Sequence, residues 1–157
     1  MGVAFKNMNE NQRAGSLAKS YLNSASKQES KVVLDKNAQN VYSDNIYAYL
    51  MEVDFDHNLS LKVLKQPSSK VFFSIFNLLL NTIDPHLLLK NNLTEDKFPT
   101  IVKYIGYPYM LPKAVFVALT APHTWPHLLC LLSWMVDLVK YKSVILKESG
   151  KKMQNLK

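Results

Sequence analysis

The sequence predicts an all-α protein, with one helical domain preceded by a flexible N-terminal tail. The chain has 157 residues, 48% of them hydrophobic, which suits one compact domain with a buried core. After about residue 35, apolar residues recur at the three- and four-residue spacing of helices. Before that point, Asn, Ser, Gln and Lys dominate and apolar periodicity is weak.

The tail carries five Lys or Arg residues against two acids within positions 1–34. Such a polar segment cannot offset its ordering entropy by burying apolar surface, so we expect it to be flexible. The expected boundaries are a basic tail over 1–34, a helical domain over 35–149 and a C-terminal extension over 150–157.

The first helix of the domain is expected to start at Ser43, a residue type that caps helices, and to end near Asp54. Its inward positions follow the spacing of one helical face. They are Ile46, Tyr49, Leu50 and Val53.

A second helix is expected after Pro67, capped by Ser68 or Ser69 and closed by Asp84-Pro85. Its inward residues are Phe72, Ile75, Phe76, Leu79, Leu80 and Ile83. The length and spacing of this stripe indicate a core helix.

A third helix is expected after Thr94 and before Gly106, where glycine favours a helix end. Glu95 and Asp96 complement the positive dipole at its start. Its inward residues are Phe98, Ile101, Val102 and Ile105. A short helical turn is expected to follow within Pro112 to Leu119.

The last helix is expected to begin at Thr124 as N-cap, with Pro126 in its first turn, where a missing N–H costs little. Its wide apolar stripe predicts a central, largely buried helix. The stripe consists of Leu128, Leu131, Leu132, Met135, Val136 and Val139. Trp125 and Trp134 are interpreted as core anchors.

His123, His127 and Cys130 invite comparison with a metal or nucleophile site. His123 precedes the expected helix whereas His127 lies within it, so the pair does not share one helical face, and no HExxH glutamate is present. A thiol inside an apolar helix is a structural residue rather than a nucleophile. We therefore expect no metal, no cofactor and no catalytic site, and the protein is not expected to be an enzyme.

The net charge of +7 points either to an ordinary solvated surface or to a polyanionic partner. Arg13 is the only arginine, which disfavours nucleic acid as that partner. The apolar run from Leu128 to Val139 is shorter than the roughly 20 residues that span a bilayer, so no membrane partner is expected. A single cysteine fits a reducing compartment, the cytosol or the nucleus.

Three segments together resemble the calponin-homology domain of the HEC, or NDC-eighty, family, the large microtubule-binding subunits of the outer-kinetochore NDC complex. They are HNLSLKVLKQPSSKVFFSIFNLLL, FPTIVKYIGYPYMLPKA and TAPHTWPHLLCLLSWMVDLVK. The most specific feature is a combination of motifs. GYP is followed by APHTWPH, which leads into the helix that ends with WMVDLVK. The resemblance covers about Asp35 to Glu148.

This resemblance implies a calponin-homology helical bundle that pairs with the sister subunit "Nuf-two" and binds microtubules in mitosis. The location it implies is the outer kinetochore, at the centromere of chromosomes in the nucleus. By matching segments, the microtubule-binding residues are Lys62, Lys70, Lys103, Lys113 and His123. Their side chains are expected to be exposed, and the basic tail is expected to add charge for an acidic tubulin lattice.

The chain departs from the family pattern in three ways. No Lys or Arg in the tail stands two residues before Ser or Thr, as basophilic kinases prefer, no sustained heptads follow the domain, and Pro112 precedes Lys113. Two alternatives stay open: a calponin-homology module for pairing or actin binding, and a basic helical module for another polyanion such as nucleic acid.

Overall fold

The computed structural model describes residues 33–55, 58–66, 68–90, 95–119 and 121–155, and these ranges form helices and loops without a β-strand. The expected tail lies outside them except for Val33, which is buried, and Leu34. The helices in chain order are α2 (Lys36–Glu52), α3 (Leu61–Lys65), α4 (Ser69–Ile83), α5 (Pro85–Lys90), the 3-10 turn η1 (Glu95–Lys97), α6 (Phe98–Tyr104), α7 (Lys113–Val117) and α8 (Trp125–Gln154).

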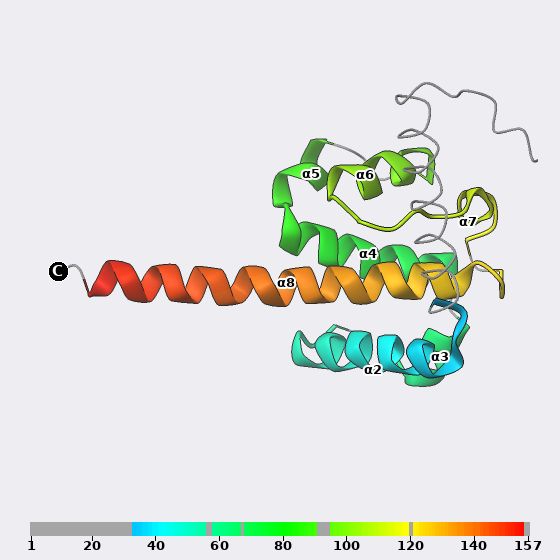
Figure 1. Cartoon of the computed structure of the whole chain (residues 1–157), viewed down its shortest axis with the longest axis horizontal. Coiled ribbons are helices and arrows are strands. Elements are labelled where there is room, and N and C mark those ends of the chain that lie inside the picture. The colour runs from blue at the N-terminus through cyan, green and yellow to red at the C-terminus, as the bar shows by residue number, and fades with distance from the viewer. Residues whose placement is uncertain (1–32, 56–57, 67, 91–94, 120, 156–157) are drawn as a thin grey trace, which may run out of the picture.

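Helix α8 is the central element of the fold, and both α2 and α4 pack against it. In Figure 1, α8 runs along the molecule with α2 on one side and α4, α5 and α6 on the other. The predicted apolar stripe of α8 is confirmed, because all six of its residues from Leu128 to Val139 are buried. Burying a side chain of this size contributes roughly 1.5–3 kcal/mol, so this stripe accounts for the central position of the helix.

Beyond Val139, α8 continues as an exposed helix to Gln154. Lys151 and Lys152 lie in its last turn. The expected C-terminal extension over 150–157 is therefore helical as far as Gln154 and continues α8. Lysines near a helix C-terminus interact favourably with the helix dipole, and no proline interrupts this segment.

Helix α2 starts earlier than the sequence predicted. Its N-cap is Asp35, whose carboxylate accepts a hydrogen bond from the Ala38 N–H at 3.4 Å. Ser43 is not a cap: it is buried in mid-helix, and its hydroxyl donates to the Gln39 carbonyl at 2.9 Å. Of the predicted inward residues, Ile46, Tyr49 and Leu50 are buried, whereas Val53, the C-cap, is exposed.

Helix α4 agrees with its prediction. Ser68 is the N-cap and accepts from the Val71 N–H at 3.3 Å. Five of its predicted inward residues are buried, and Ile83 is partly buried. At the other end, the Lys142 ammonium donates to the Ile83 carbonyl at 2.8 Å, so α8 caps the C-terminus of α4. The short helix α5, which was not predicted, follows immediately.

Helix α6 ends at a glycine, as expected, but it begins only at Phe98, with Pro99 in its first turn, because Glu95–Lys97 form the 3-10 turn η1. Gly106 has φ +78°, a left-handed conformation that glycine adopts without strain. The Gly106 N–H donates to the Lys103 carbonyl and the Tyr107 N–H donates to the Val102 carbonyl. These two bonds form a Schellman motif, which turns the chain back towards α7. The expected Thr94 boundary lies outside the described residues.

Candidate binding surface

Trp125, the first residue of α8, joins three helices in the core. Its side chain is 5% exposed, and its indole N–H donates to the Leu64 carbonyl at 2.9 Å, which ties α8 to α3. Its ring meets Phe72 of α4 edge-on, with centroids 6.3 Å apart. The prediction that Trp125 is a core anchor is confirmed. Trp134 is only partly buried and packs against the core beside Tyr107.

Thr124 holds the end of α7 against the start of α8. It occupies the predicted N-cap position, but its hydroxyl makes no capping bond. The buried hydroxyl instead lies within hydrogen-bonding distance of the carbonyls of Ala118, Leu119 and Ala121. A hydroxyl directed at carbonyls behind it acts as a donor, so Thr124 closes the preceding loop rather than capping the helix.

Four of the five predicted binding residues lie on the elements that meet at these two side chains. Lys62 belongs to α3, Lys70 to the first turn of α4 and Lys113 to the first turn of α7, while His123 immediately precedes Thr124. All four side chains are exposed. Figure 1 shows α3, α7 and the yellow start of α8 at one end of the molecule, opposite the C-terminus. We call these four residues the basic end.

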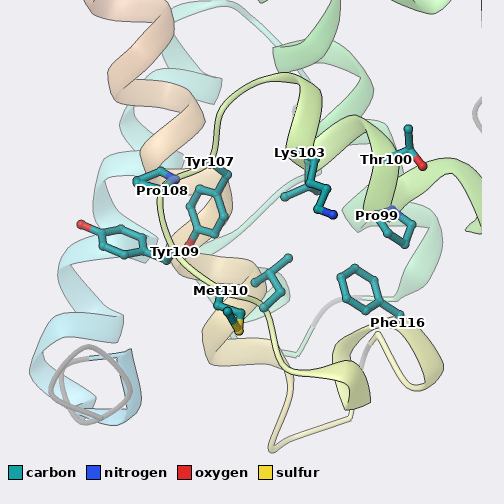
Figure 2. Close-up of a pocket in the computed structure, with 10 residues that line it drawn as sticks. Pro99, Thr100, Lys103, Tyr107, Pro108, Tyr109, Met110 and Phe116 are labelled. Atoms are coloured by element: carbon teal, nitrogen blue, oxygen red, sulfur yellow. The ribbon is translucent and has the colours of Figure 1, made fainter. Parts of the chain in front are cut away.

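Lys103 is also exposed, but it occupies a different local setting at the C-terminal end of α6. Its side chain lines a groove of about 730 Å³ between α6, the loop after Gly106 and α7. Figure 2 shows the Lys103 ammonium extending into the space bordered by Tyr107, Met110 and Phe116. We call this space the Tyr107 groove. The ring of Phe116 packs edge-on against Phe98 at 5.8 Å, which fixes α7 beside α6.

The chain segment that carries Lys103, Lys113 and the groove has charges of one sign. Positions 97–136 include Lys97, Lys103 and Lys113 but no Asp or Glu. Two lysines of α8 instead make hydrogen bonds within the fold: Lys140 donates to the Asn45 side chain at 2.8 Å, and Lys142 donates to the Ile83 carbonyl at 2.8 Å. Exposed lysines in a chain segment that contains no Asp or Glu favour an anionic partner.

The histidines and the cysteine do not converge on a metal site. His123 is exposed, whereas His127 is half-buried, and burial lowers the pKa of His127 below its ordinary value of 6.5. Cys130 is buried, as predicted. Burial, reinforced by the nearby Cys130, raises the pKa of Tyr42 to about 12, so this phenol stays neutral. Within the described ranges, no three His, Cys, Asp or Glu side chains are grouped to hold a metal ion.

Among the residues that the structure describes, no helix combines the length and the apolar character needed to cross a bilayer.

The Tyr107 groove and helix α3 were not anticipated from the sequence. Ser60 caps α3 by accepting from the Val63 N–H at 3.4 Å, and Leu64 is buried. Ser60, followed by Leu61 and Leu64 at helical spacing, could have indicated this helix. No comparable signal exists for the groove, because its walls come from segments that only the Schellman turn at Gly106 brings together.

A helical domain of the calponin-homology type accounts for this arrangement, since the helices bury one core around α8. Comparison with known proteins then gives the family. Residues 37–149 match the model of the HEC/Ndc80p family. The chain belongs to this family, and the all-α calponin-homology prediction is confirmed.

Individual relatives support this assignment. The chain is 36% identical to the "Kinetochore protein NDC80 homolog" of Mus musculus over 105 residues, covering 67% of this chain and 16% of that protein. It is 34% identical over 124 residues to the "Probable kinetochore protein NDC80" of Encephalitozoon cuniculi, covering 78% of this chain and 22% of that protein. The Danio rerio homologue is 31% identical over 121 residues, which are 77% of this chain and 19% of that protein. The match therefore spans about a fifth of each relative.

Proposed function

We propose that this chain is a microtubule-binding calponin-homology module of a kinetochore protein and that the basic end contacts tubulin. The observation that carries the proposal is the convergence of Lys62, Lys70, Lys113 and His123 on the elements joined by Trp125 and Thr124. Family membership supports it, because the relatives are named as kinetochore proteins and not as enzymes. Lys103, in the last turn of α6, adds a further exposed cation to the proposed contact.

The binding mechanism is electrostatic. Each exposed charge contact with an acidic lattice contributes only about 0.2–1 kcal/mol, so one module binds weakly and several lysines must act together. Because positions 97–136 contain no carboxylate, the field of Lys103 and Lys113 is not cancelled within their own segment. The basic residues of positions 1–34 add positive charge to the same interaction.

The same proposal includes a partner and a location. The module pairs with the calponin-homology domain of the sister subunit Nuf-two within the NDC complex. It acts at the outer kinetochore, at the centromere of chromosomes in the nucleus, and links chromosomes to spindle microtubules. It carries out no chemical reaction.

Charge reversal at α7 gives the sharpest test. Lys113→Glu replaces attraction by repulsion, and we expect about a tenfold loss of microtubule affinity, near 1.4 kcal/mol. Lys103→Glu should have a similar effect. The matched control is Lys151→Glu, which changes net charge equally in the last turn of α8. At about 1.5 Å per residue, this control lies roughly 39 Å along the helix axis from Trp125.

Binding should be measured by co-sedimentation with the sister subunit present, after circular dichroism has shown that each variant keeps its helices. Raising the salt concentration should erase binding as the Debye length shrinks from about 10 Å to about 3 Å. Equal losses from Lys113→Glu and Lys151→Glu would show that only bulk charge matters. Salt-insensitive binding would contradict the electrostatic mechanism, and preferential sedimentation with actin filaments or DNA would favour a different partner.

A further inference from the structure

The Tyr107 groove is an apolar surface to which the proposed microtubule contact assigns no role except through Lys103. Its volume of about 730 Å³ falls within the ~300–1,000 Å³ common for ligand sites. Its walls are mainly aromatic, proline and aliphatic side chains. They include Pro99, Tyr107, Pro108, Tyr109, Met110 and Phe116. Lys103 is the one charged residue in the lining.

Several of these side chains are unusually exposed for apolar residues. Met110 is 86% exposed, Tyr109 is 40% exposed and Phe116 is 37% exposed. Tyr104, which flanks the groove in sequence, is also exposed. Contiguous exposed apolar surface on a folded domain is typical of an interaction site. Because its walls are so exposed, the groove cannot enclose a small molecule. It suits an extended peptide that continues past both ends of the groove.

The positive charge of this region determines which kind of peptide suits the groove. The groove lies within positions 97–136, where every charged side chain is a lysine. An incoming segment with Asp or Glu beside its apolar residue would meet Lys103, whose ammonium points into the groove (Figure 2). This chain's own residues 1–34 carry a surplus of positive charge and are disfavoured as the occupant. Extended segments commonly use proline or another apolar anchor in aromatic-lined grooves.

We propose that the Tyr107 groove binds a short extended peptide of another protein, with a proline or other apolar anchor next to an acidic residue. The anchor packs between Tyr107, Met110 and Phe116, and the neighbouring carboxylate pairs with Lys103. This activity is separate from microtubule binding, although both use the positive surface of α6 and α7.

The test starts with a random peptide library displayed on phage and selected against the full chain. We expect enrichment of peptides with an apolar or proline anchor beside Asp or Glu. One enriched peptide, made with a fluorescent label, is then titrated by anisotropy. Met110→Ser should weaken binding about tenfold, whereas Val117→Ser, a substitution of an equally exposed apolar residue outside the lining, should not.

A second pair of variants isolates the charge contact. Lys103→Glu should weaken peptide binding about tenfold or more, while Lys97→Glu, which reverses an exposed lysine of the same segment outside the lining, should have little effect. Microtubule co-sedimentation of Met110→Ser should equal that of the wild type. This result separates failure of the groove proposal from failure of the microtubule proposal.

Several outcomes would overturn the groove proposal. One is a selection that yields no anchored acidic motif. Another is equal binding by the same peptide with its anchor replaced by serine, or by polyglutamate, since the surface would then recognise charge alone. Equal effects of Met110→Ser and Val117→Ser would remove the groove as the site. Full competition by single-stranded DNA would assign the surface to nucleic acid.

Discussion

At the scale of single residues, Trp125 is the side chain on which the basic end most depends. Trp125→Ala should lower the free energy of unfolding by about 3–5 kcal/mol, because a large buried ring is removed from contact with Phe72. Trp125→Phe keeps a ring but leaves the Leu64 carbonyl without the indole donor, and should cost about 1–3 kcal/mol. Urea denaturation measures both values. Unchanged stability with lost microtubule binding would instead make Trp125 a surface contact.

His127 gives the domain a pH-dependent stability at the same scale. Burial lowers the pKa of His127 in the folded state below its ordinary value of 6.5, so the unfolded chain takes up the proton at a higher pH. The contribution of neutral His127 is therefore complete above about pH 6.5 and decreases as the pH falls through this value towards the folded pKa. Stability should fall between about pH 7.5 and about pH 5.5.

His127→Gln should reduce this fall, as measured by melting temperature at the two pH values. His86→Gln, which alters an exposed histidine, is the control. A pH dependence in His127→Gln identical to that of the wild type would show that His127 is not its source.

At the scale of elements, the end of α6 depends on the conformation of one glycine. Gly106 has φ +78°, and a Cβ added there would meet nothing within 4 Å, so the cost of a side chain is purely that of the backbone. Gly106→Ala should destabilise the domain by about 1–2 kcal/mol. The same change at Gly150, within the exposed part of α8, should stabilise by roughly 0.5–1 kcal/mol.

Thermal denaturation gives the change in stability for both variants. The same glycine-to-alanine substitution is then compared in a left-handed turn, at Gly106, and in a helix, at Gly150. Opposite signs of the change in stability are expected. A neutral Gly106→Ala would mean that the Schellman turn is not required to hold α6 and the loop that leads to α7.

At the scale of the whole molecule, the described core lies between Val33 and Val139. Removing residues 1–32 should therefore leave the melting temperature and the helical circular-dichroism signal unchanged, because no described core residue is lost. Microtubule affinity should decrease, since five Lys or Arg residues against two acids are removed with this segment. Loss of helical signal on truncation would show that the segment contributes to the fold.

The sequence alone determined the helical class and the buried faces of α4, α6 and α8, because apolar spacing and turn residues are local properties. It also offered Ser68 or Ser69 as a cap, of which the structure uses Ser68, and it identified Gly106 as a helix end, while the resemblance indicated the exposed lysines. It misplaced the start of α2, because Ser43 lies in mid-helix, where its hydroxyl bonds a backbone carbonyl. It missed α3 and α5, whose few residues give little periodicity.

Only the tertiary structure decided which of these residues meet. The basic end exists because Trp125 reaches Leu64 across 61 positions of sequence and Thr124 closes the loop after α7. The Tyr107 groove exists because the turn at Gly106 brings the following loop back past α6 towards α7. Such long-range pairings depend on how helices pack around α8, and packing is a property of the whole core that no local spacing encodes.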